Sequence, residues 1–565
     1  MNSLDRKSKL KSGTTASALT VLILFALFVG VAVQAQAQTV DTLYNFSSNS
    51  STQAIMPAGT MAQGRDGKFY GISQSGNGCC QGWFYKISST GVLTSLHAMA
   101  QSEGTNCSGV TLGTDGNFYG TCVSGGLVNG NPGGTLIRVT PTGTVTVLHN
   151  FAEVGTTTDG CSPYSPPIQG IDGNFYGVTV GCGTYGAGTV YKLTLAGAYA
   201  ELYSFQGGPS DVQRPYGGLV QGTGGNFWGM GYGGGAVEGD GGVFTITPAG
   251  KETLIYSFQG QGIDGQNPYD SLIQGIDGNF YGTTLAGGTK QFGTVFQLTP
   301  KGVEKILYDF PSQAEGAYPQ LPLTQGPDGL LYGIATDCFG GGCGQAGLFT
   351  ITTKSVYNNL YLYPLGQPNS FQPVSPLLLS TNGKFYSTTE QGGTQNVGSF
   401  YRLSTNYAPF ISLVNVRGGK EGSQVGILGQ GFTSASVVKF GGTAATKKTL
   451  TGSTFILATV PAGALTGPVT VTTGSTTVAT KATYKITPTL KTFTPSSGPV
   501  GTSVRITGTG LRQTTKVAFN EISATFTVNS DTQITVTVPT GATTGKIIVT
   551  TTGGSLTSST NFTVN

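Results

Sequence analysis

A seven-residue segment, Ile171–Gly177, recurs along two thirds of this chain and constrains its fold more than any other feature. Its sequence is Ile-Asp-Gly-Asn-Phe-Tyr-Gly, and seven copies follow one another at intervals of 49 to 57 residues. Aligned on the Asp-Gly step, they begin at Asp66, Asp115, Asp172, Gly224, Asp277, Asp328 and Asn382. A period of this size is typical of repeat architectures, in which one unit cannot bury its apolar face alone. The chain is therefore expected to contain seven similar units.

Each unit is predicted to form four antiparallel strands. In the third copy a short strand at 166–169 leads through the Asp172-Gly173 turn into a strand at 174–179, and strands at 188–194 and 200–205 follow. Aromatic and β-branched residues fill these segments, and Gly or Pro-x-Gly turns separate them. Seven such meanders predict an all-β fold, a seven-bladed β-propeller, whose radial repetition protects the strand edges.

The two ends of the repeat region are predicted to meet. After its third strand, which ends near Ser404, the seventh unit has no fourth strand. Val40–Phe46 has the fourth-strand pattern, but no first three strands precede it. We therefore expect this N-terminal strand to complete the last blade and close a propeller that spans residues 38–406.

The start of the chain has the order of a secretory signal. Four basic residues between positions 6 and 11 precede an apolar run at 16–33, and Ala35-Gln36-Ala37 follows. This order predicts a signal peptide at residues 1–37 with cleavage after Ala37 or Gln38. An uncleaved anchor helix is the alternative, because about eighteen apolar residues can just span a bilayer.

The charge of the mature chain argues against nucleic acid as a partner. Removal of residues 1–37 leaves 25 basic and 24 acidic residues, a net charge of +1. A chain this close to neutrality offers no electrostatic attraction for nucleic acids or anionic membranes. No membrane insertion is expected after signal cleavage.

All eight cysteines are predicted to lie on one face of the propeller. The tight turns of a meander share one end of its strands, whereas the longer loops and the crossovers between units share the other, here named the loop face. An even number of cysteines in an exported chain indicates disulfides. We expect the pairs Cys107–Cys122, Cys161–Cys182 and Cys338–Cys343, with Cys79 and Cys80 paired as neighbours or unassigned. A zinc site is a weaker alternative, since the spacings do not repeat as ligand pairs.

Tyrosines recur on the loop face, just before the innermost strand of several units. They are Tyr164, Tyr216 and Tyr269, with Tyr318 as a near variant. A tyrosine ring offers a flat apolar face with a hydroxyl at its rim, which suits stacking on sugar rings. These four residues are the candidate ligand-binding residues, and packing between blades is the alternative interpretation.

The Asp-Gly turns and the two histidines are interpreted as structural. The turns lack the acid spacing of an EF-hand, so their aspartates are expected to accept local hydrogen bonds. His97 and His149 occupy fourth-strand positions where other copies carry tyrosine, which indicates packing. No metal site, cofactor or Ser-His-Asp triad is expected.

A pair of loop-face acids is the basis of the alternative function, a propeller-based polysaccharide hydrolase or lyase. The candidate acids depart from the repeat pattern. They are Glu103, Asp159, Asp211, Glu238, Asp240, Asp264, Asp270, Glu315 and Asp337. The sequence places no two of them at a working separation, so a non-catalytic role is the leading interpretation.

The composition changes after about Asn406, where aromatic residues become rare and two copies of about 78 residues begin. Residues 422–432 match 501–511, and Val460-Pro461 matches Val538-Pro539. Apolar residues alternate with threonine in these segments, which favours short half-buried strands. We expect two Ig-like β-sandwiches, at 407–486 and 487–565.

Two families share these motifs. The stretch Gly-Thr-x-Val-x-Ile-x-Gly-x-Gly at 501–510 and the later Val-Pro resemble IPT/TIG Ig-like domains. The repeated Asp-Gly-Asn-Phe-Tyr-Gly and Gly-Thr-Val-Phe-x-Leu-Thr-Pro motifs resemble the bacterial secreted GloVer tandem-repeat proteins. The resemblance implies an exported protein with extracellular spacer or binding modules and implies no particular reaction. We expect a binding, adhesion or scaffold protein at the cell surface, outside the cell or in the periplasm, with glycans or surface proteins as partners.

Overall fold

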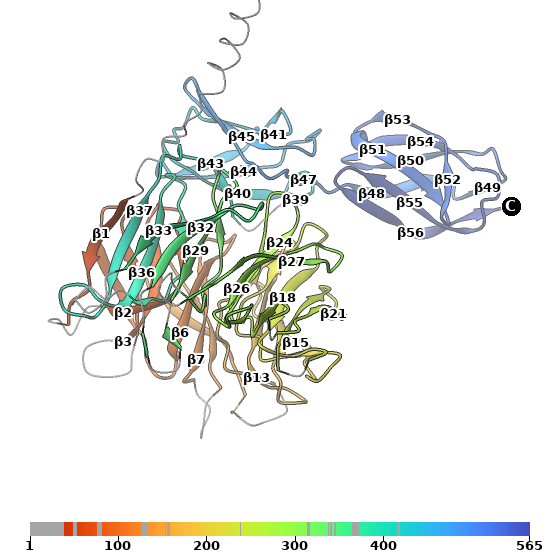
Figure 1. The fold of residues 1–565 in the computed structure, drawn as a ribbon. Coiled ribbons are helices and arrows are strands. Elements are labelled where there is room, and N and C mark those ends of the chain that lie inside the picture. Colours follow the sequence, from red (N-terminus) through yellow and green to blue (C-terminus); the bar gives the residue numbers. More distant parts are fainter. Residues whose placement is uncertain are drawn as a thin grey trace, which may run out of the picture. The chain divides into compact units, whose positions relative to one another are not determined.

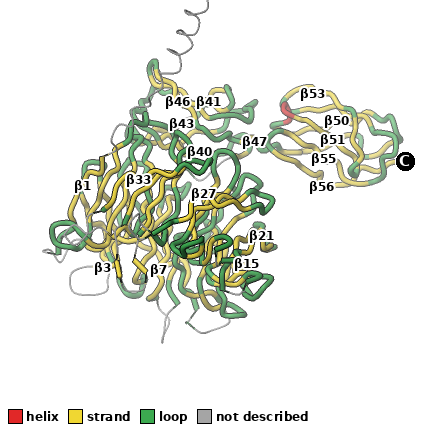
Figure 2. The backbone as a smooth tube through the Cα atoms, in the orientation of Figure 1, coloured by secondary structure: helices red, strands yellow, loops and turns green. Residues whose placement is uncertain are grey.

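The computed structural model describes an all-β chain (Figure 2). The described residues are 39–48, 54–75, 82–126, 133–152, 154, 159–237, 239–260, 262–312, 317–336, 338–339, 342–343, 346–363, 372–414 and 418–565. The helical content of these residues is one 3₁₀ turn, η2 (Leu511–Gln513). Across the same ranges, no helix has the length and apolar character that spanning a bilayer requires. The signal peptide expected at 1–37 lies outside the described residues.

Each of the first six copies of the repeat forms a four-stranded antiparallel meander, as the sequence predicted. The first units contain β2 (Ile55–Gln63), β3 (Phe69–Ser75), β4 (Trp83–Ile87) and β5 (Leu93–Ala98), then β6 (Thr105–Leu112), β7 (Phe118–Ser124), β8 (Thr135–Val139) and β9 (Val145–Asn150). The third and fourth contain β11 (Ile168–Gln169), β12 (Phe175–Thr179), β14 (Thr189–Leu193) and β15 (Tyr199–Ser204), then β17 (Val220–Gln221), β18 (Phe227–Gly231), β20 (Gly242–Ile246) and β21 (Glu252–Ser257).

The later units follow the same order of strands. They contain β23 (Ile273–Gln274), β24 (Phe280–Thr284), β26 (Thr294–Leu298) and β27 (Glu304–Asp309), then β28 (Thr324–Gln325), β29 (Leu331–Ala335), β32 (Gly347–Ile351) and β33 (Tyr357–Leu362). The seventh contains β34 (Gln372–Pro373), β35 (Leu378–Leu379), β36 (Phe385–Gln391) and β37 (Ser399–Ser404). Short loop ribbons pair β10 (Gly160–Cys161) with β13 (Gly181–Cys182), β16 (Val212–Gln213) with β19 (Gly233–Gly234), β22 (Gly265–Gln266) with β25 (Ala286–Gly287), and β30 (Cys338–Phe339) with β31 (Gly342–Cys343).

The N-terminal strand completes the last unit, as the sequence predicted. β1 (Thr39–Asn45) lies beside β37 in the sheet of the seventh unit (Figure 1). The guanidinium of Arg402 in β37 donates a hydrogen bond to the Asp41 carboxylate in β1 over 2.8 Å. The first and last strands of the repeat region therefore lie in the same sheet.

The first two units join in one eight-stranded sheet, which the sequence did not predict. A parallel bridge pairs Thr60 in β2 with Gly109 in β6. Two glycines permit this approach: a Cβ on Gly59 would lie 1.9 Å from the carbonyl oxygen of Ser108, and a Cβ on Gly109 would lie 2.3 Å from the Thr60 nitrogen.

Aromatic pairs hold successive units together. Tyr119 stacks on Phe175 of the next unit with 3.8 Å between ring centroids, and Tyr176 packs on Phe227 at 4.1 Å. The same relation joins the last unit to the first, because Tyr386 packs against Phe69 at 4.3 Å. Both faces of the second strand are therefore buried. The phenylalanine of one unit meets the tyrosine of its neighbour.

The repeated aspartate stabilises its own turn, as the sequence indicated. Asp172 accepts hydrogen bonds from the Asn174 backbone N–H at 3.1 Å and from the Tyr176 hydroxyl at 2.7 Å. Hydrogen bonding by Tyr176 and Asn174 lowers the pKa of Asp172 against the opposing effect of burial, and Lys192 adds an attractive charge. The hydrogen bonds of the Asp172 carboxylate thus come from residues of its own hairpin.

The described residues after 406 form two sets of strands, with three sheets in the first set and two in the second. The first set contains β38 (Ser412–Leu413), β39 (Gly418–Gly419), β40 (Gln424–Leu428), β41 (Val437–Phe440), β42 (Thr443–Ala444), β43 (Lys448–Thr451), β44 (Phe455–Thr459), β45 (Val469–Thr473), β46 (Thr476–Ala479) and β47 (Lys485–Ile486). The second contains β48 (Thr489–Thr494), β49 (Ser497–Gly498), β50 (Ser503–Thr509), β51 (Thr514–Phe519), β52 (Ile522–Ala524), β53 (Phe526–Ser530), β54 (Gln533–Thr537), β55 (Gly545–Thr551) and β56 (Gly554–Val564).

The strand orders of the two sets correspond. The order β38-β40-β44-β43 matches β48-β50-β54-β53, and the second sheet of each set matches in the same way. Each set has its own apolar core. The first set also contacts a tight turn of the repeat region, because the Thr454 hydroxyl donates to the Arg65 carbonyl oxygen at 2.6 Å and the Arg65 guanidinium lies 4.4 Å from the Phe455 ring centroid.

Candidate ligand-binding cavity

The crossovers between units end in a recurring backbone conformation, here named the left-handed step, which leads into the innermost strand of the next unit. A non-glycine residue with left-handed φ opens the step in six units. These residues are Met56, Asn106, Ser162, Arg214, Asn267 and Tyr318, with φ between 52° and 57°. Such a conformation is costly outside glycine and asparagine, so the surroundings must fix it.

Hydrogen bonds to the preceding unit and within the same unit provide this constraint. The Arg214 N–H donates to the Ala187 carbonyl oxygen at 2.9 Å, and its own carbonyl oxygen accepts from Tyr232 N–H at 3.2 Å. Asn267 N–H donates in the same way to the Asp240 carbonyl oxygen at 2.9 Å. Proline follows directly in most units and fixes φ for the start of the strand.

The residue two positions after each left-handed residue faces one cavity of about 590 Å³. In chain order these lining residues are Ala58, Ser108, Tyr164, Tyr216, Tyr269 and Gln320, and Val374 lines it from the seventh unit. The backbone therefore repeats while the side chains do not. Three consecutive units present tyrosine, whereas the first, second and seventh present small side chains.

The three tyrosines, here named the tyrosine wall, contact one another. Tyr216 stacks on Tyr269 with 4.7 Å between centroids and an interplanar angle of 17°, and Tyr164 meets Tyr216 edge-on at 5.2 Å. Tyr232, which follows β18, packs edge-on against Tyr216 at 5.6 Å. Tyr164 is the most accessible of the wall, with 41 % of its surface exposed. Burial raises the pKa of Tyr269 to about 12, and its tyrosine neighbours add to the effect, so the Tyr269 hydroxyl is uncharged at neutral pH.

The fourth candidate, Tyr318, does not belong to this wall. It packs edge-on against Phe292 at 5.7 Å and is absent from the residues that line the cavity. The reason is the order of the dipeptide. Tyr318 precedes its proline and occupies the left-handed position, so Gln320 takes the place at the cavity that tyrosine holds in the three preceding units.

Asp270 is the one charged side chain among the described residues that line the cavity. Its Oδ1 accepts hydrogen bonds from the backbone N–H of Ser271 at 2.6 Å and from the Ser271 hydroxyl at 3.2 Å. The residue as a whole is partly buried and lines the cavity. Burial raises the pKa of Asp270 to about 7, against the effect of the two Ser271 hydrogen bonds.

The other candidate acids that the structure describes have structural partners. The Tyr203 hydroxyl donates to Asp211 at 2.9 Å, and the Tyr256 hydroxyl donates to Asp264 at 2.6 Å. Asp240 accepts from the Gln266 side-chain amide at 2.5 Å. Glu238, Glu315 and Asp337 lie outside the described residues.

The two histidines take the place of these tyrosines, as the repeat alignment predicted. His97 Nε2 lies 2.8 Å from the Glu103 carboxylate, and His149 Nε2 lies 2.7 Å from that of Asp159. His149 also stacks on Tyr199 with ring centroids 3.6 Å apart. Each histidine therefore anchors the acid of the crossover that follows it. A glycosidase-type pair of carboxyl groups facing the cavity is not formed by the described residues, since Asp270 stands there alone.

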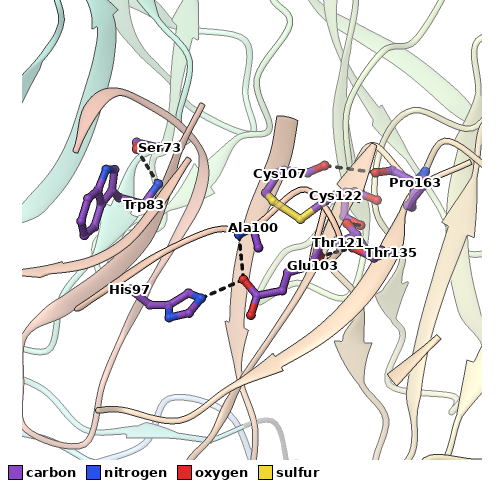
Figure 3. Close-up of a disulfide and its surroundings, with 12 residues drawn as sticks. Ser73, Trp83, His97, Ala100, Glu103, Cys107, Thr121, Cys122, Thr135 and Pro163 are labelled. Carbon is purple, nitrogen blue, oxygen red and sulfur yellow. Dashed lines mark hydrogen bonds and ion pairs between the residues drawn. A yellow bond between two sulfur atoms is a disulfide. The ribbon is translucent and has the colours of Figure 1, made fainter. Parts of the chain in front are cut away.

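Two disulfides stabilise the loop face. Cys107 pairs with Cys122, and Cys161 pairs with Cys182, which are the pairs that the sequence predicted. Figure 3 shows the first of them beside Pro163 and near the hydrogen bond between His97 and Glu103. Cys107 itself lines the cavity, so this bridge joins the cavity wall to β7.

The other four cysteines remain without a described pairing. The backbone register places Cys338 opposite Cys343, and their side chains are not among those described. Cys79 and Cys80 lie outside the described residues. The expected Cys338–Cys343 bridge therefore stays a prediction.

Sequence reasoning missed Tyr232 and did not single out Asp270 among its candidate acids. Tyr232 sits in a 2–3 loop with no counterpart in the other copies, so no periodic signal marks it. Asp270 was one of nine candidate acids, and only its place beside Tyr269 distinguished it. Once the left-handed residue of each crossover is known, the repeat alignment identifies the small residues Ala58 and Ser108 as the counterparts of the wall tyrosines.

The chain was compared with known proteins. Two overlapping matches to the Gloeobacter/Verrucomicrobia repeat cover residues 29–236 and 162–401, and the IPT/TIG domain model matches residues 488–564. No curated protein matches the sequence.

Solved structures give weak likenesses. A fungal alcohol oxidase of the AA5 family, in complex with copper, has a TM-score of 0.44 at 13 % identity and covers 94 % of this chain and 100 % of its own. The surface glycan-binding protein PbSGBP-B from Prevotella bryantii has a TM-score of 0.22 at 18 % identity over 28 % of this chain and 40 % of its own. SGBP-B of a Bacteroides uniformis xyloglucan utilization locus has a TM-score of 0.15 at 18 % identity over 27 % and 48 %.

The repeat model accounts for most of the chain, and the strands that it covers share one meander and one set of turn contacts. This chain belongs to the Gloeobacter/Verrucomicrobia repeat family and carries an IPT/TIG domain at residues 488–564.

Proposed function

We propose that this protein is an exported, non-catalytic binding protein that holds a carbohydrate in the cavity lined by the tyrosine wall. The observation that carries the proposal is the asymmetry of the lining. Tyr164, Tyr216 and Tyr269 stand together on one side of a cavity of about 590 Å³, and small residues such as Ala58 and Ser108 stand elsewhere around it. A volume of this size is within the usual range of small-molecule sites.

The architecture that we propose for this function is a seven-bladed propeller at 38–406 followed by Ig-like modules at 407–486 and 487–565. Two contacts support closure. The β1–β37 pairing repeats the pairing of third and fourth strands within a unit, and the Tyr386–Phe69 contact repeats the aromatic contact that joins consecutive units. The corresponding strand orders of the two C-terminal sets of strands support a second Ig-like module.

Export of the chain is part of the same proposal. We assign residues 1–37 as a signal peptide that is removed, which places the mature chain outside the cytoplasm. Two disulfides among the loops support this assignment, because such bridges persist in oxidising compartments. The partners that we propose are glycans at the cell surface or in the surroundings.

Tyrosine suits the proposed ligand for a physical reason. The apolar faces of sugar rings stack on aromatic rings, and the phenol hydroxyl at the rim can exchange hydrogen bonds with sugar hydroxyls. The wall is also pre-organised, because its rings already pack against one another before any ligand arrives, and this lowers the entropy that binding must overcome.

A glycan array followed by titration calorimetry tests the proposal with the chain 38–565. We expect Tyr216→Ala to weaken binding of the retained glycan by about tenfold or more, as truncation of a central aromatic contact does. The matched control is Tyr185→Ala, since Tyr185 is 59 % exposed and does not line the cavity. No bound glycan on the array would contradict the proposal and favour a purely structural spacer. Equal binding by both variants would contradict the tyrosine wall as the binding site.

A further inference from the structure

The cavity has a second feature that the stacking of sugars does not use. Asp270 places a carboxyl group at its wall, beside Tyr269 and two residues before Leu272, which also lines it. Both hydrogen bonds of this carboxyl use Oδ1 and come from the adjacent Ser271. Within the described residues, Oδ2 accepts no hydrogen bond.

The carboxyl also lacks a counter-charge. No lysine, arginine or histidine is among the described residues that line the cavity, and the influences on Asp270 are burial and Ser271 alone. A carboxylate enclosed by protein without a cation is unfavourable, and a ligand that brings a positive charge removes this cost.

The position of Asp270 in the repeat shows that the fold does not require an acid there. The first, third, fourth and seventh units carry Gly59, Ser165, Gly217 and Ser375 at the equivalent step, two residues after the proline. Gly217 matters for the geometry, because a Cβ on it would lie 2.3 Å from the Asp270 carbonyl carbon. The backbone of Asp270 therefore packs closely on the neighbouring unit while its side chain is free to differ.

We propose that the cavity binds a saccharide that carries a protonated primary amine, with the ammonium at Asp270 Oδ2 and the sugar ring against the tyrosine wall. The inference rests on the carbohydrate-binding function proposed above and narrows its ligand to amino sugars. Tyrosine faces add to the attraction, because their ring quadrupoles favour a nearby cation. Anionic saccharides such as uronates are disfavoured by the same carboxylate.

Titration calorimetry at pH 7.5 tests this with three probes: a glucosamine tetrasaccharide, the same tetrasaccharide fully N-acetylated, and spermidine. Acetylation removes the charge and keeps the sugar backbone, whereas spermidine keeps amine charge without a sugar. We expect the free-amine tetrasaccharide to bind about 10- to 100-fold more tightly than its acetylated form, the range for a hydrogen bond between charged groups. We expect spermidine to bind more weakly than the free-amine sugar.

Two variants isolate the carboxyl. Asp270→Asn removes its charge, and Asp270→Ser installs the residue that Ser165 and Ser375 provide in other units, so at least one of them is expected to fold. In both variants the free-amine and N-acetylated tetrasaccharides are expected to bind with about equal affinity. The control is Glu252→Gln, which neutralises a carboxyl whose pKa is likewise raised to about 7 by burial but which does not line the cavity.

The outcomes separate this inference from the function on which it rests. Equal binding of both tetrasaccharides by the wild-type chain, or an unchanged preference in both Asp270 variants, overturns the amine assignment and leaves carbohydrate binding intact. Binding of neither tetrasaccharide overturns the amino-sugar assignment, whereas the glycan array decides the carbohydrate-binding function. Spermidine that binds as tightly as the amino sugar overturns the saccharide part, since charge alone would then suffice.

Discussion

The backbone N–H of Thr381 donates a hydrogen bond to the side-chain oxygen of Gln63 over 3.0 Å, although the two residues are 318 positions apart. The same contact joins consecutive units: Thr114 N–H donates to Gln169, Ile171 to Gln221, Thr223 to Gln274 and Ile276 to Gln325, at 2.8 to 2.9 Å. This glutamine clasp is missing at two junctions. Leu112 replaces glutamine between the first and second units, and between the sixth and seventh units Pro327 has no N–H and Leu379 replaces glutamine. The seventh unit therefore contacts the first through the same kind of hydrogen bond that joins consecutive units.

Gln63→Leu is expected to lower the free energy of unfolding by about 1–3 kcal/mol, because it leaves a buried Thr381 N–H without an acceptor. Gln63 is 7 % exposed and Thr381 1 % exposed. Gln274→Leu is the matched control, since its clasp with Thr223 is exposed and water can replace it. Urea unfolding followed by fluorescence measures both. A Gln274→Leu cost equal to or above that of Gln63→Leu would contradict the importance assigned to closure.

The repeat region is expected to lose stability as the pH rises from 5 to 8. Burial, reinforced by Asp211 and Asp264 respectively, raises the pKa of Glu252 and of Glu304 to about 7. An acid whose pKa is higher in the folded than in the unfolded state stabilises the fold below its unfolded pKa, and that contribution disappears as the pH rises through the folded pKa. Asp270 acts with the same sign.

Scanning calorimetry at pH 5 and pH 8 checks this, with an expected fall in Tm of roughly 2–4 °C for each kcal/mol lost. The lowered pKa values of Asp172 and Asp277 act in a more acidic range and leave this window unaffected. Glu252→Gln combined with Glu304→Gln is expected to flatten the profile. A wild-type Tm that rises toward pH 8 would refute the assignment.

Loss of the Cys161–Cys182 bridge is expected to cost about 3 kcal/mol of unfolding free energy, because its closed loop restricts the unfolded chain. The cysteines are 21 residues apart in sequence. The double variant Cys161→Ser/Cys182→Ser, compared with wild type in denaturant with and without a reducing agent, measures this cost. If the reducing agent has no effect on wild type, the bridge is not stabilising.

Gly217→Ala is expected to destabilise the chain by about 1–3 kcal/mol and to weaken ligand binding, since overpacking against a fixed backbone forces a shift. Its Cβ would lie 2.3 Å from the carbonyl carbon of Asp270. Gly224→Ala is the control, because an added Cβ there meets nothing within 4 Å. Thermal unfolding of both variants decides, and a neutral Gly217→Ala would show that the Asp270 backbone can move.

Local pattern in the sequence predicted much of the fold. The period, the Asp-Gly turns and the displaced strand at Val40–Phe46 can all be read because strand pairing within a unit depends on residues close in the chain. The equivalence of His97 with Tyr203 follows from the same alignment. In the structure each side chain forms a hydrogen bond with an acid of the crossover that follows it. The two described disulfides join cysteines 15 and 21 residues apart, within reach of this local reasoning.

The candidate site was only partly predictable. The motif Pro-Tyr marked Tyr164, Tyr216 and Tyr269, but the sequence could not distinguish them from Tyr318, whose order with proline is reversed. Tyr318 lies two positions before Gln320, at the left-handed residue of its crossover, so its ring does not reach the position that lines the cavity. The parallel bridge between Thr60 and Gly109 was invisible for a related reason, since it depends on two glycines in different units.

The sequence by itself determined that this chain repeats one four-stranded unit, that its first strand belongs to its last unit, and which aromatic residues fill the unit. Only the tertiary structure decided that Tyr164, Tyr216 and Tyr269 share a wall, and that Asp270 is the charged group beside them. The physical reason is that a unit is specified by hydrogen bonds and packing between near neighbours, whereas a cavity is made by one residue from each of several units. Its character depends on which side chains those units happen to bring to the same place.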